Sequence, residues 1–302
     1  MTPTTAPMLV HSLICHRDVG MAVTCLTTLY RCADRAIDLR LHDDGSITPD
    51  DAAQLQAAFP TARLISREES DQLAAEGLRS LPKCREFRGV TVMGLKLFDP
   101  LLMGRDPFLL LDTDVLFFNP FENLFAPVPQ GYALIYMEDF VYSYSVTPQE
   151  TLAHRELRPV RLLNAGMLFV YAGQIDLEYI EYLLAKHPHL VQKGGVTEQT
   201  AWGILGMRHG ARKWNRRQVS IVTDDFQPGA DQVAAHFVSP TRHRLAAFAA
   251  GTGTGLSGRR VRVETEAATP YSSIRTLGDF LGNRIHNRLY RLRQTVRAAK
   301  AT

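Results

Sequence analysis

Two aspartates follow the most apolar stretch of the chain. Asp112 and Asp114 come at the end of the run 108–111, FLLL, which reads as a buried strand. A carboxylate is costly to bury unless it is paired or binds a metal ion. Carboxylates two residues apart at a strand end can converge on one hard divalent ion, Mg²⁺ or Mn²⁺, which could also hold a substrate diphosphate. The alternative is a pair of turn aspartates that cap the next segment.

The aspartate pair resembles that of the haloacid-dehalogenase-type phosphatases, in which the first aspartate is a nucleophile and the second an acid or base. That family normally has Thr or Val four residues after the first aspartate, where this chain has Leu116. Asp224, Asp225 and Lys213 could take the family's downstream roles. A phosphatase that uses Asp112 as nucleophile is therefore one functional alternative.

Four segments in order resemble the GT-A glycosyltransferases, in particular the family 8 group. The D-x-D motif of that group, which holds the divalent ion of a nucleotide-diphosphate sugar, matches Asp112-Thr-Asp114. Its N-(A/S)-G strand, its D-Q-D segment and its late H-F segment resemble 163–170 (LNAGMLFV), 197–202 (TEQTAW) and 233–238 (VAAHFV). The resemblance covers roughly residues 9–245.

The resemblance implies a metal-dependent transferase that moves a sugar from a nucleotide-diphosphate sugar, with a UDP-sugar expected, to a glycan, lipid or protein acceptor. Transfer would retain the anomeric configuration. Mn²⁺ or Mg²⁺ would be held by Asp112, Asp114 and His236. Beside the donor sugar we expect Asn164, Glu198 and Gln199 as catalytic residues. The residues expected along the rest of the donor are His16, Asp18, Asp43, Asp44, Lys96, Asp112, Thr113, Asn164, Ala165, Gly166, Arg242 and Arg244.

Several of these positions depart from the family pattern. Glu198 stands where the family has Asp, and the segment 239–244 (SPTRHR) stands where it has Gly and then K-P-W. Arg242 or Arg244 would then replace the lysine that binds the diphosphate, because guanidinium pairs well with phosphate oxygens. A scaffold that binds sugar nucleotides without turnover is a further alternative.

Each position also has a plainer interpretation. Glu198 and Gln199 could form the first turn of a helix capped by Thr197. The other plain interpretations are a core histidine for His236, a strand entry for Asn164, a solvated helix lysine for Lys96 and a β-turn for Asp43 and Asp44.

The elements that must position these residues follow from apolar periodicity and helix-start signals. The expected strands are 9–15, 37–42, 62–66 and 108–112, and the expected helices are 19–32, 49–58 and 68–78. This β-α-β-α-β order predicts an open, mixed and mainly parallel α/β sheet flanked by helices, which agrees with a GT-A-like, Rossmann-like fold. Ligands of such sheets bind beyond the carboxyl ends of the strands.

Composition narrows the class of protein. The 302 residues are 45% hydrophobic and 22% charged, which excludes wholesale disorder and a fibrous repeat. Four cysteines without C-x-x-C spacing indicate reduced thiols in a cytoplasmic protein. The N-terminal segment lacks the features of a signal peptide, and no apolar run approaches the roughly 20 residues that span a bilayer.

The chain divides into a catalytic domain at 1–248, a glycine-rich linker region at 249–270 and a basic helical tail at 271–302. The tail carries seven Lys or Arg against one Asp, and its apolar residues recur at 274, 277, 281, 285, 289, 292 and 296. Such an amphipathic helix can lie on an anionic membrane surface, here the inner face, or can dock on the body or on a second subunit. No basic patch or aromatic platform in the body suggests nucleic-acid binding.

Overall fold

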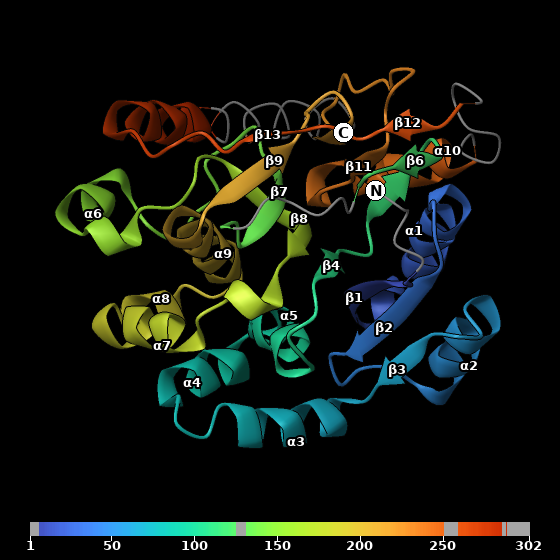
Figure 1. Cartoon of the computed structure of the whole chain (residues 1–302), viewed down its shortest axis with the longest axis horizontal. Coiled ribbons are helices and arrows are strands. Elements are labelled where there is room, and N and C mark those ends of the chain that lie inside the picture. Colours follow the sequence, from blue (N-terminus) through green and yellow to red (C-terminus); the bar gives the residue numbers. More distant parts are fainter. Residues whose placement is uncertain (1–5, 125–130, 251–258, 286–287, 289–302) are drawn as a thin grey trace, which may run out of the picture.

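The computed structural model describes residues 6–124, 131–250, 259–285 and 288. An eight-stranded sheet with the order β13-β9-β7-β8-β4-β1-β2-β3 forms its centre (Figure 1). A three-stranded sheet, β10-β11-β5, and a two-stranded sheet, β12-β6, adjoin it. The strands are β1 (Met8–Ile14), β2 (Ile37–Asp43), β3 (Arg63–Ile65), β4 (Phe108–Leu111), β5 (Val115–Phe117), β6 (Phe121–Glu122), β7 (Leu134–Glu138), β8 (Leu163–Val170), β9 (Ala211–Trp214), β10 (Val219–Ile221), β11 (Ala234–His236), β12 (Val261–Arg262) and β13 (Thr265–Ala267).

Helices cover both faces of the central sheet. The α-helices are α1 (Val19–Cys32), α2 (Pro49–Ala58), α3 (Arg67–Gly77), α4 (Pro82–Val90), α5 (Val92–Leu102), α6 (Pro148–Ala153), α7 (Leu177–Lys186), α8 (His189–Gln192), α9 (Gly195–His209) and α10 (Leu245–Ala249). Four short 3₁₀ turns are η1 (His16–Asp18), η2 (Arg155–Leu157), η3 (Ala172–Gln174) and η4 (Ser239–Arg244). A further helix occupies 273–285.

The predicted α/β class is confirmed, and the predicted elements of the N-terminal third are present with ends shifted by a residue or two. Thr48 caps α2 as its sequence predicts. The Thr48 hydroxyl accepts from the Asp51 N–H, and the Asp51 carboxylate accepts from the Thr48 N–H. This reciprocal capping satisfies backbone donors that the first turn of a helix leaves free.

Strand direction decides which residues meet at one edge of the sheet. Strands β4, β1, β2 and β3 run parallel, as predicted, whereas β8 runs antiparallel to both β4 and β7. The start of β8 therefore lies beside the carboxyl end of β4, with Met167 opposite Leu111. In the small sheet, His236 on β11 pairs with Val115 on β5.

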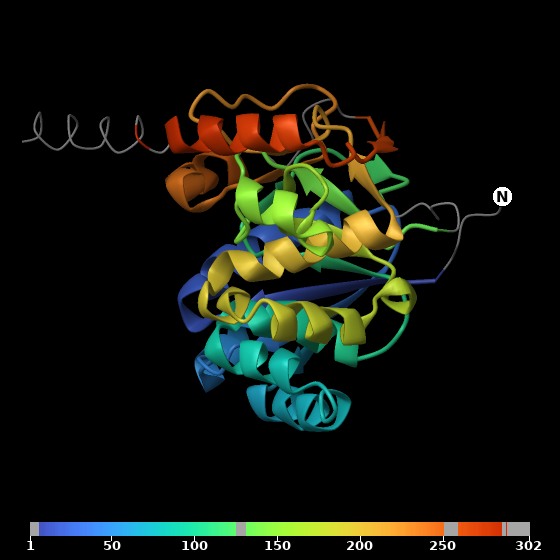
Figure 2. The ribbon, with the colours of Figure 1, turned by 90° about the vertical axis from the view of Figure 1, so that its left-hand side faces the viewer.

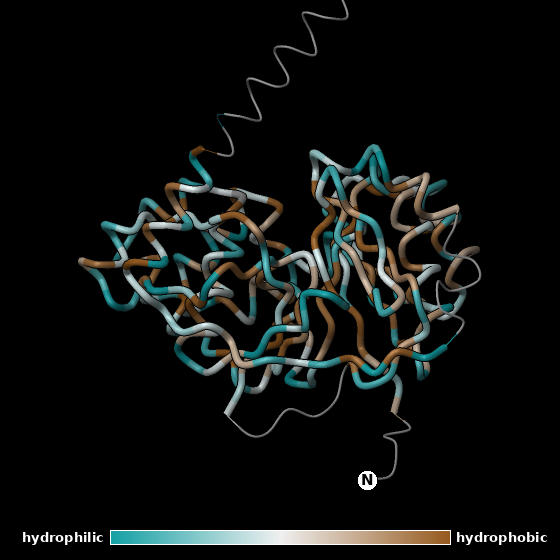
Figure 3. Tube along the Cα trace, turned by 90° about the horizontal axis from the view of Figure 1, so that it is seen from above, coloured by the Kyte–Doolittle hydropathy of each residue, from teal (hydrophilic) through white to brown (hydrophobic). Residues whose placement is uncertain are grey.

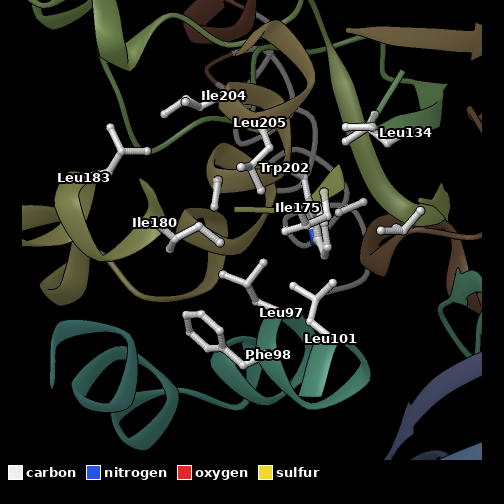
Figure 4. Packing of buried hydrophobic residues seen from close by; sticks show 14 of the residues in the cluster. Leu97, Phe98, Leu101, Leu134, Ile175, Ile180, Leu183, Trp202, Ile204 and Leu205 are labelled. Carbon is white, nitrogen blue, oxygen red and sulfur yellow. The ribbon is translucent and has the colours of Figure 1, made fainter. Parts of the chain in front are cut away.

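The unbroken apolar run of β4 is explained by burial on both faces. Phe108 and Leu110 point into a core with α5, α7 and α9, whereas Leu109 and Leu111 point into a second core with α1 and α2. Figure 4 shows side chains of α5 and α9 packed around Trp202 in the first core. Viewed from above, the trace of the described chain has two lobes (Figure 3).

The segment at 249–270 is partly built into the body. Among its described residues, β12 pairs with β6, and β13 pairs with β9 at the edge of the main sheet. The helix at 273–285 then lies along the body (Figure 2). The expected tail residues at 286–287 and 289–302 fall outside the described part of the chain. Within the part that is described, no helix combines the length and the apolar character that crossing a bilayer requires.

Candidate active site at the carboxyl edge of the sheet

The chemistry-bearing residues predicted from the sequence gather where several strands end. Asp112 and Asp114 follow β4, and the antiparallel direction of β8 brings Asn164 beside them. His236 arrives from β11, whose neighbour β5 begins one residue after Asp114. Backbone bonds lock this corner, because the Asp112 N–H donates to the carbonyl of Gly166 and the Phe237 N–H donates to the carbonyl of Asp114.

Three side chains of this corner form a candidate metal site. One oxygen each of Asp112 and Asp114 and one nitrogen of His236 all lie within 4.8 Å of one another. His236 Nε2 is 3.0 Å from Asp114 Oδ1 and 3.8 Å from Asp112 Oδ2. Asp114 Oδ1 is buried and accepts no hydrogen bond from the described residues. Two carboxylates and one imidazole are a suitable ligand set for Mn²⁺ or Mg²⁺, so the residues present fit a divalent ion.

The second nitrogen of His236 is held by Asn164. His236 Nδ1 lies 2.9 Å from Asn164 Oδ1, which also accepts from the Gly166 N–H at 2.9 Å. Because this amide oxygen is an acceptor, Nδ1 carries the proton and Nε2 is the atom directed at the two carboxylates. Such an outer hydrogen bond orients a metal-binding histidine.

Gly166 is required by the close approach of His236. A Cβ atom on residue 166 would lie 2.2 Å from His236 Cε1 and 2.9 Å from Asn164 Oδ1. Both distances are far inside van der Waals contact, so any larger residue would displace the imidazole. The small residue that the sequence places in 163–170 therefore makes room for His236.

The charge balance of the cluster rests on buried ion pairs. Burial raises the pKa of Asp114, but the charges of His236 and Arg242 outweigh it and bring the pKa to about 2. For His236, burial lowers the pKa, and the carboxylates of Asp114 and Asp112 reverse that effect to give a raised pKa. The cluster therefore holds positive charge close to its carboxylates.

Lys96 is a buried part of this network, in contrast to its interpretation as a solvated helix lysine. Its Nζ lies 2.7 Å from Asp112 Oδ1 and donates to the carbonyl of Ala165 at 2.9 Å. The same Nζ is 3.9 Å from Glu198. Burial lowers the pKa of Lys96, but the two carboxylates raise it above its usual value. Lys96 thus lies behind Asp112, with 6% of its side chain exposed.

Glu198 does not face solvent as a sugar-lining residue would. Its carboxylate accepts from the Trp202 indole N–H at 2.7 Å, and burial raises its pKa to about 7. Helix α9 also begins at Gly195, so Thr197 is inside the helix and bonds Leu190 and Ser145 instead of capping it. The sequence placed this helix start three residues too late, because the observed cap is Gly194.

Gln199 and Asn164 link the start of α9 to the start of β8. Gln199 accepts from the Ala165 N–H at 3.1 Å and donates to the carbonyl of Ser143 at 2.7 Å. Asn164 Nδ2 donates to Asp139 at 3.0 Å, and Asp139 also accepts from the N–H groups of Phe140 and Val141. Burial raises the pKa of Asp139.

The two arginines proposed for a diphosphate have different positions. Arg242 Nε donates to Asp114 Oδ2 at 2.7 Å, and 39% of the Arg242 side chain is exposed. Arg244 instead donates to the backbone carbonyls of Thr223 and Phe226 and lies over the ring of Phe248. Only the first of these arginines contacts the candidate metal site. The sequence could not decide between them, because both lie in the same six-residue turn, η4.

The residues expected to face a nucleotide lie after β1 and β2. Asp43 and Asp44 each accept from the N–H groups of the turn that follows them, which agrees with their β-turn interpretation. His16 pairs with Asp51 of α2 at 2.6 Å, a contact that the sequence does not predict. Burial lowers the pKa of Arg242, but the carboxylate of Asp114 and, to a smaller extent, that of Asp18 raise it above its usual value. Asp18 of η1 is therefore within electrostatic reach of the metal cluster. Thr113 is buried between the two aspartates.

Two of the downstream groups that the phosphatase alternative would use are engaged elsewhere. Lys213 pairs with Glu138 at 2.8 Å, and Asp225 accepts from the Thr223 hydroxyl at 2.6 Å. Leu116, at the position where that family has Thr or Val, is buried in β5. The geometry therefore does not favour a phosphatase.

Comparison with known proteins identifies the fold. No protein family and no curated protein matches the sequence. Among solved structures, the apo form of mouse xyloside xylosyltransferase 1 is similar, with a TM-score of 0.56, 13% identity, and coverage of 78% of this chain and 99% of that one. The galactosyltransferase LgtC, solved with donor and acceptor sugar analogues, has a TM-score of 0.53, 15% identity, and coverage of 82% and 97%. The chain therefore has the fold of the GT-A glycosyltransferases.

Proposed function

We propose that this protein is a metal-dependent glycosyltransferase that moves a sugar from a nucleotide-diphosphate sugar to an acceptor. The observation that carries the proposal is the convergence of Asp112, Asp114 and His236 within 4.8 Å at the carboxyl edge of the sheet. The similar solved structures include the apo form of a xylosyltransferase. They also include a galactosyltransferase in complex with donor and acceptor sugar analogues. A nucleotide-diphosphate sugar, with UDP as the expected nucleotide, is therefore the proposed donor.

The proposed site holds Mn²⁺ or Mg²⁺ through Asp112, Asp114 and His236, and the ion would neutralise the charge that develops on the departing diphosphate. Arg242 adds a half-exposed guanidinium on the solvent side of Asp114. Guanidinium matches the geometry of phosphate oxygens, so Arg242 is the residue proposed to contact the diphosphate. Lys96 stays buried and neutralises Asp112 from behind.

The donor sugar is proposed to lie against the start of β8, near Asn164 and Gln199. Hydrogen bonds to backbone or carboxylate groups fix the orientation of both side-chain amides. The amides therefore need no reorganisation when the donor sugar binds beside them. Glu198 is proposed to support this region from the core through Trp202 and Lys96. Retention of the anomeric configuration remains part of the proposal. The nucleotide is proposed to lie toward His16, Asp18, Asp43 and Asp44.

The test is a screen of nucleotide-diphosphate sugars for release of nucleoside diphosphate in the presence of Mn²⁺. The wild-type chain is expected to release it, and Asp114→Asn is expected to lose this activity by at least about a hundredfold, the loss typical of one electrostatic catalytic group. Asp225→Asn is a matched control, because Asp225 is exposed and would matter only in a phosphatase. Phosphomonoester hydrolysis, or donor binding without release, would contradict the proposal.

A second proposal concerns the surface of the helix at 273–285. Its inner face is anchored on the body, because Arg161 forms two hydrogen bonds of 2.8 and 2.9 Å with Asp279, and Asn283 donates to the carbonyl of Tyr142 at 2.6 Å. Phe280 packs edge-on against the Tyr142 ring. The helix is therefore docked, which was one of the two interpretations of its sequence.

Docking leaves the apolar stripe of this helix on the outside. The exposed fractions are 85% for Ile274, 44% for Leu277, 48% for Leu281 and 62% for Ile285. Arg275, Arg284 and Arg288 are also exposed, whereas the one acid of the segment, Asp279, is neutralised by Arg161. A stripe of apolar side chains flanked by arginines fits an anionic membrane surface, so we propose peripheral membrane association through this face.

Vesicle flotation of the full chain tests this second proposal. Wild type is expected to float with vesicles rich in anionic lipid and less with neutral ones, and the double variant Leu277→Ser/Leu281→Ser is expected to stay behind. Leu152→Ser is the matched control, because Leu152 is 56% exposed but lies on α6. Equal flotation of both variants would contradict the proposal. A concentration-dependent dimer that Leu277→Ser/Leu281→Ser abolishes would assign the stripe to self-association instead.

A further inference from the structure

A second group of metal-binding side chains lies outside the candidate active site. His154 directly follows α6, Glu156 lies in η2, and His187 directly follows α7. One nitrogen of each imidazole and one carboxylate oxygen lie within 4.8 Å of one another. The sequence gives little sign of the group, because about thirty residues separate Glu156 from His187.

The distances in this group suit a tetrahedral ion. His187 Nε2 is 3.2 Å and His154 Nδ1 is 3.8 Å from the same oxygen, Glu156 Oε1. Metal–ligand bonds of about 2.0–2.2 Å, as at zinc, place the ligand atoms of a tetrahedron roughly 3.3–3.6 Å apart. Small side-chain rotations would bring all three atoms to these separations. We propose that His154, Glu156 and His187 form a Zn²⁺ site that ties η2 to the end of α7.

The site already attracts a cation. Lys186 Nζ lies 2.7 Å from Glu156 Oε1, on a side chain that is 44% exposed. A long lysine stem at the surface can turn back into solvent, and its ammonium would leave the oxygen to a divalent ion. Lys186 would then be freed to contact only Tyr182, from whose hydroxyl it is 2.8 Å away in this structure.

Burial is graded across the three ligands. The side chain of His187 is 7% exposed, that of Glu156 18% and that of His154 45%. The buried imidazole is thus fixed by packing, and the exposed one leaves a path from solvent. Two imidazoles and one carboxylate favour Zn²⁺ over Mg²⁺, whereas the two carboxylates of the candidate active site suit the harder ions. The two sites therefore differ in the metal they select.

Calorimetric titration of the chelator-treated full chain with Zn²⁺ tests this proposal. The Asp114→Asn chain serves as the starting protein, so that the candidate active site is disabled. The Asp114→Asn chain is expected to bind one Zn²⁺. Adding His154→Ala or Glu156→Gln to it is expected to weaken Zn²⁺ binding at least about tenfold, because losing even a hydrogen-bond partner of a metal ligand has an effect of that size. His243→Ala is the matched control, because His243 is an exposed imidazole in η4 and is expected to leave the affinity unchanged.

Replacement of Zn²⁺ by Co²⁺ supplies a second readout. Bound Co²⁺ is expected to show the visible absorption of a four-coordinate ion, which His154→Ala removes. His154 is exposed, so this variant keeps the test valid if Glu156→Gln fails to fold. Unchanged Zn²⁺ affinity in His154→Ala, or no Zn²⁺ binding by the Asp114→Asn chain, would overturn the proposal.

Discussion

Arg242 donates a hydrogen bond of 2.7 Å to Asp114, and the pair joins a half-exposed cation to a carboxylate that is 1% exposed. The same Asp114 is one of the three proposed metal ligands. Arg242 therefore neutralises an oxygen of the site from the side that faces solvent. An incoming divalent ion and this guanidinium compete for the same negative charge, whereas both favour a bound diphosphate.

The first prediction is that Arg242→Gln changes metal and nucleotide binding in opposite directions. Without nucleotide, Mn²⁺ affinity is expected to rise about three- to fivefold, the effect of losing a partly exposed ion pair. With Mn²⁺ present, UDP affinity is expected to fall, because a phosphate partner has been removed. Titration calorimetry measures both affinities.

Arg217→Gln is the control for this prediction, because Arg217 is exposed in the turn between β9 and β10. It is expected to change neither affinity. If Arg242→Gln weakened Mn²⁺ binding instead, Arg242 would be needed to hold the metal ligands in place. That result would contradict the proposed competition between Arg242 and Mn²⁺ for Asp114.

The second prediction concerns the space beside His236. Gly166→Ala places a Cβ atom 2.2 Å from the imidazole, so His236 must shift or the fold must strain. The free energy of unfolding is expected to fall by about 1–3 kcal/mol, as for other overpacked sites, and Mn²⁺ binding is expected to be lost. Chemical denaturation and Mn²⁺ titration measure the two effects.

Gly173→Ala serves as the comparison for the second prediction, since a Cβ on residue 173 would meet only the Arg105 carbonyl at an ordinary 3.6 Å. Its stability and Mn²⁺ affinity are expected to match those of wild type. Normal Mn²⁺ binding by Gly166→Ala would show that His236 is not a ligand.

The sequence predicted the class of fold and the positions of Asp112 and Asp114 well, because local periodicity and an apolar run report burial directly. It could not decide the surroundings of Lys96 and Glu198, which depend on how α5 and α9 pack against the end of β4. The sequence also could not assign the roles of Arg242 and Arg244. The direction of η4 places the side chain of Arg242 beside Asp114 and that of Arg244 away from it. The outward direction of Leu277 and its neighbours was also unpredictable, because either face of an amphipathic helix can dock.

The third prediction is a pH dependence of stability that comes from a buried histidine pair. His11 Nδ1 lies 2.7 Å from His42 Nε2, and both side chains are at most 2% exposed. Burial lowers the pKa of His11 to about 2 and that of His42 to about 3. Below about pH 6.5 these two histidines are therefore protonated in the unfolded chain but stay neutral in the folded chain. The free energy of unfolding therefore decreases as the pH falls.

For each histidine, the free energy of unfolding is expected to decrease by about 1.4 kcal/mol for every pH unit below the pKa that the histidine has in the unfolded chain. In urea unfolding at pH 7.5, 6.0 and 5.0, His42→Gln is expected to lose stability less steeply with acid than wild type. His243→Gln, which replaces an exposed imidazole, is expected to keep the wild-type slope. An unchanged slope in His42→Gln would show that this pair does not resist protonation.

Asp112, Asp114 and His236 are proposed to hold a divalent ion that binds the diphosphate of the donor. The most direct measurement is the affinity of the full chain for UDP, determined with Mn²⁺ and again with chelator, for wild type, His236→Ala and Asp225→Asn. Mn²⁺ is expected to tighten UDP binding at least about tenfold, or ~1.4 kcal/mol, in wild type and Asp225→Asn but not in His236→Ala. UDP binding that is equally tight with and without Mn²⁺, or a Mn²⁺ effect that survives in His236→Ala, would contradict this proposal.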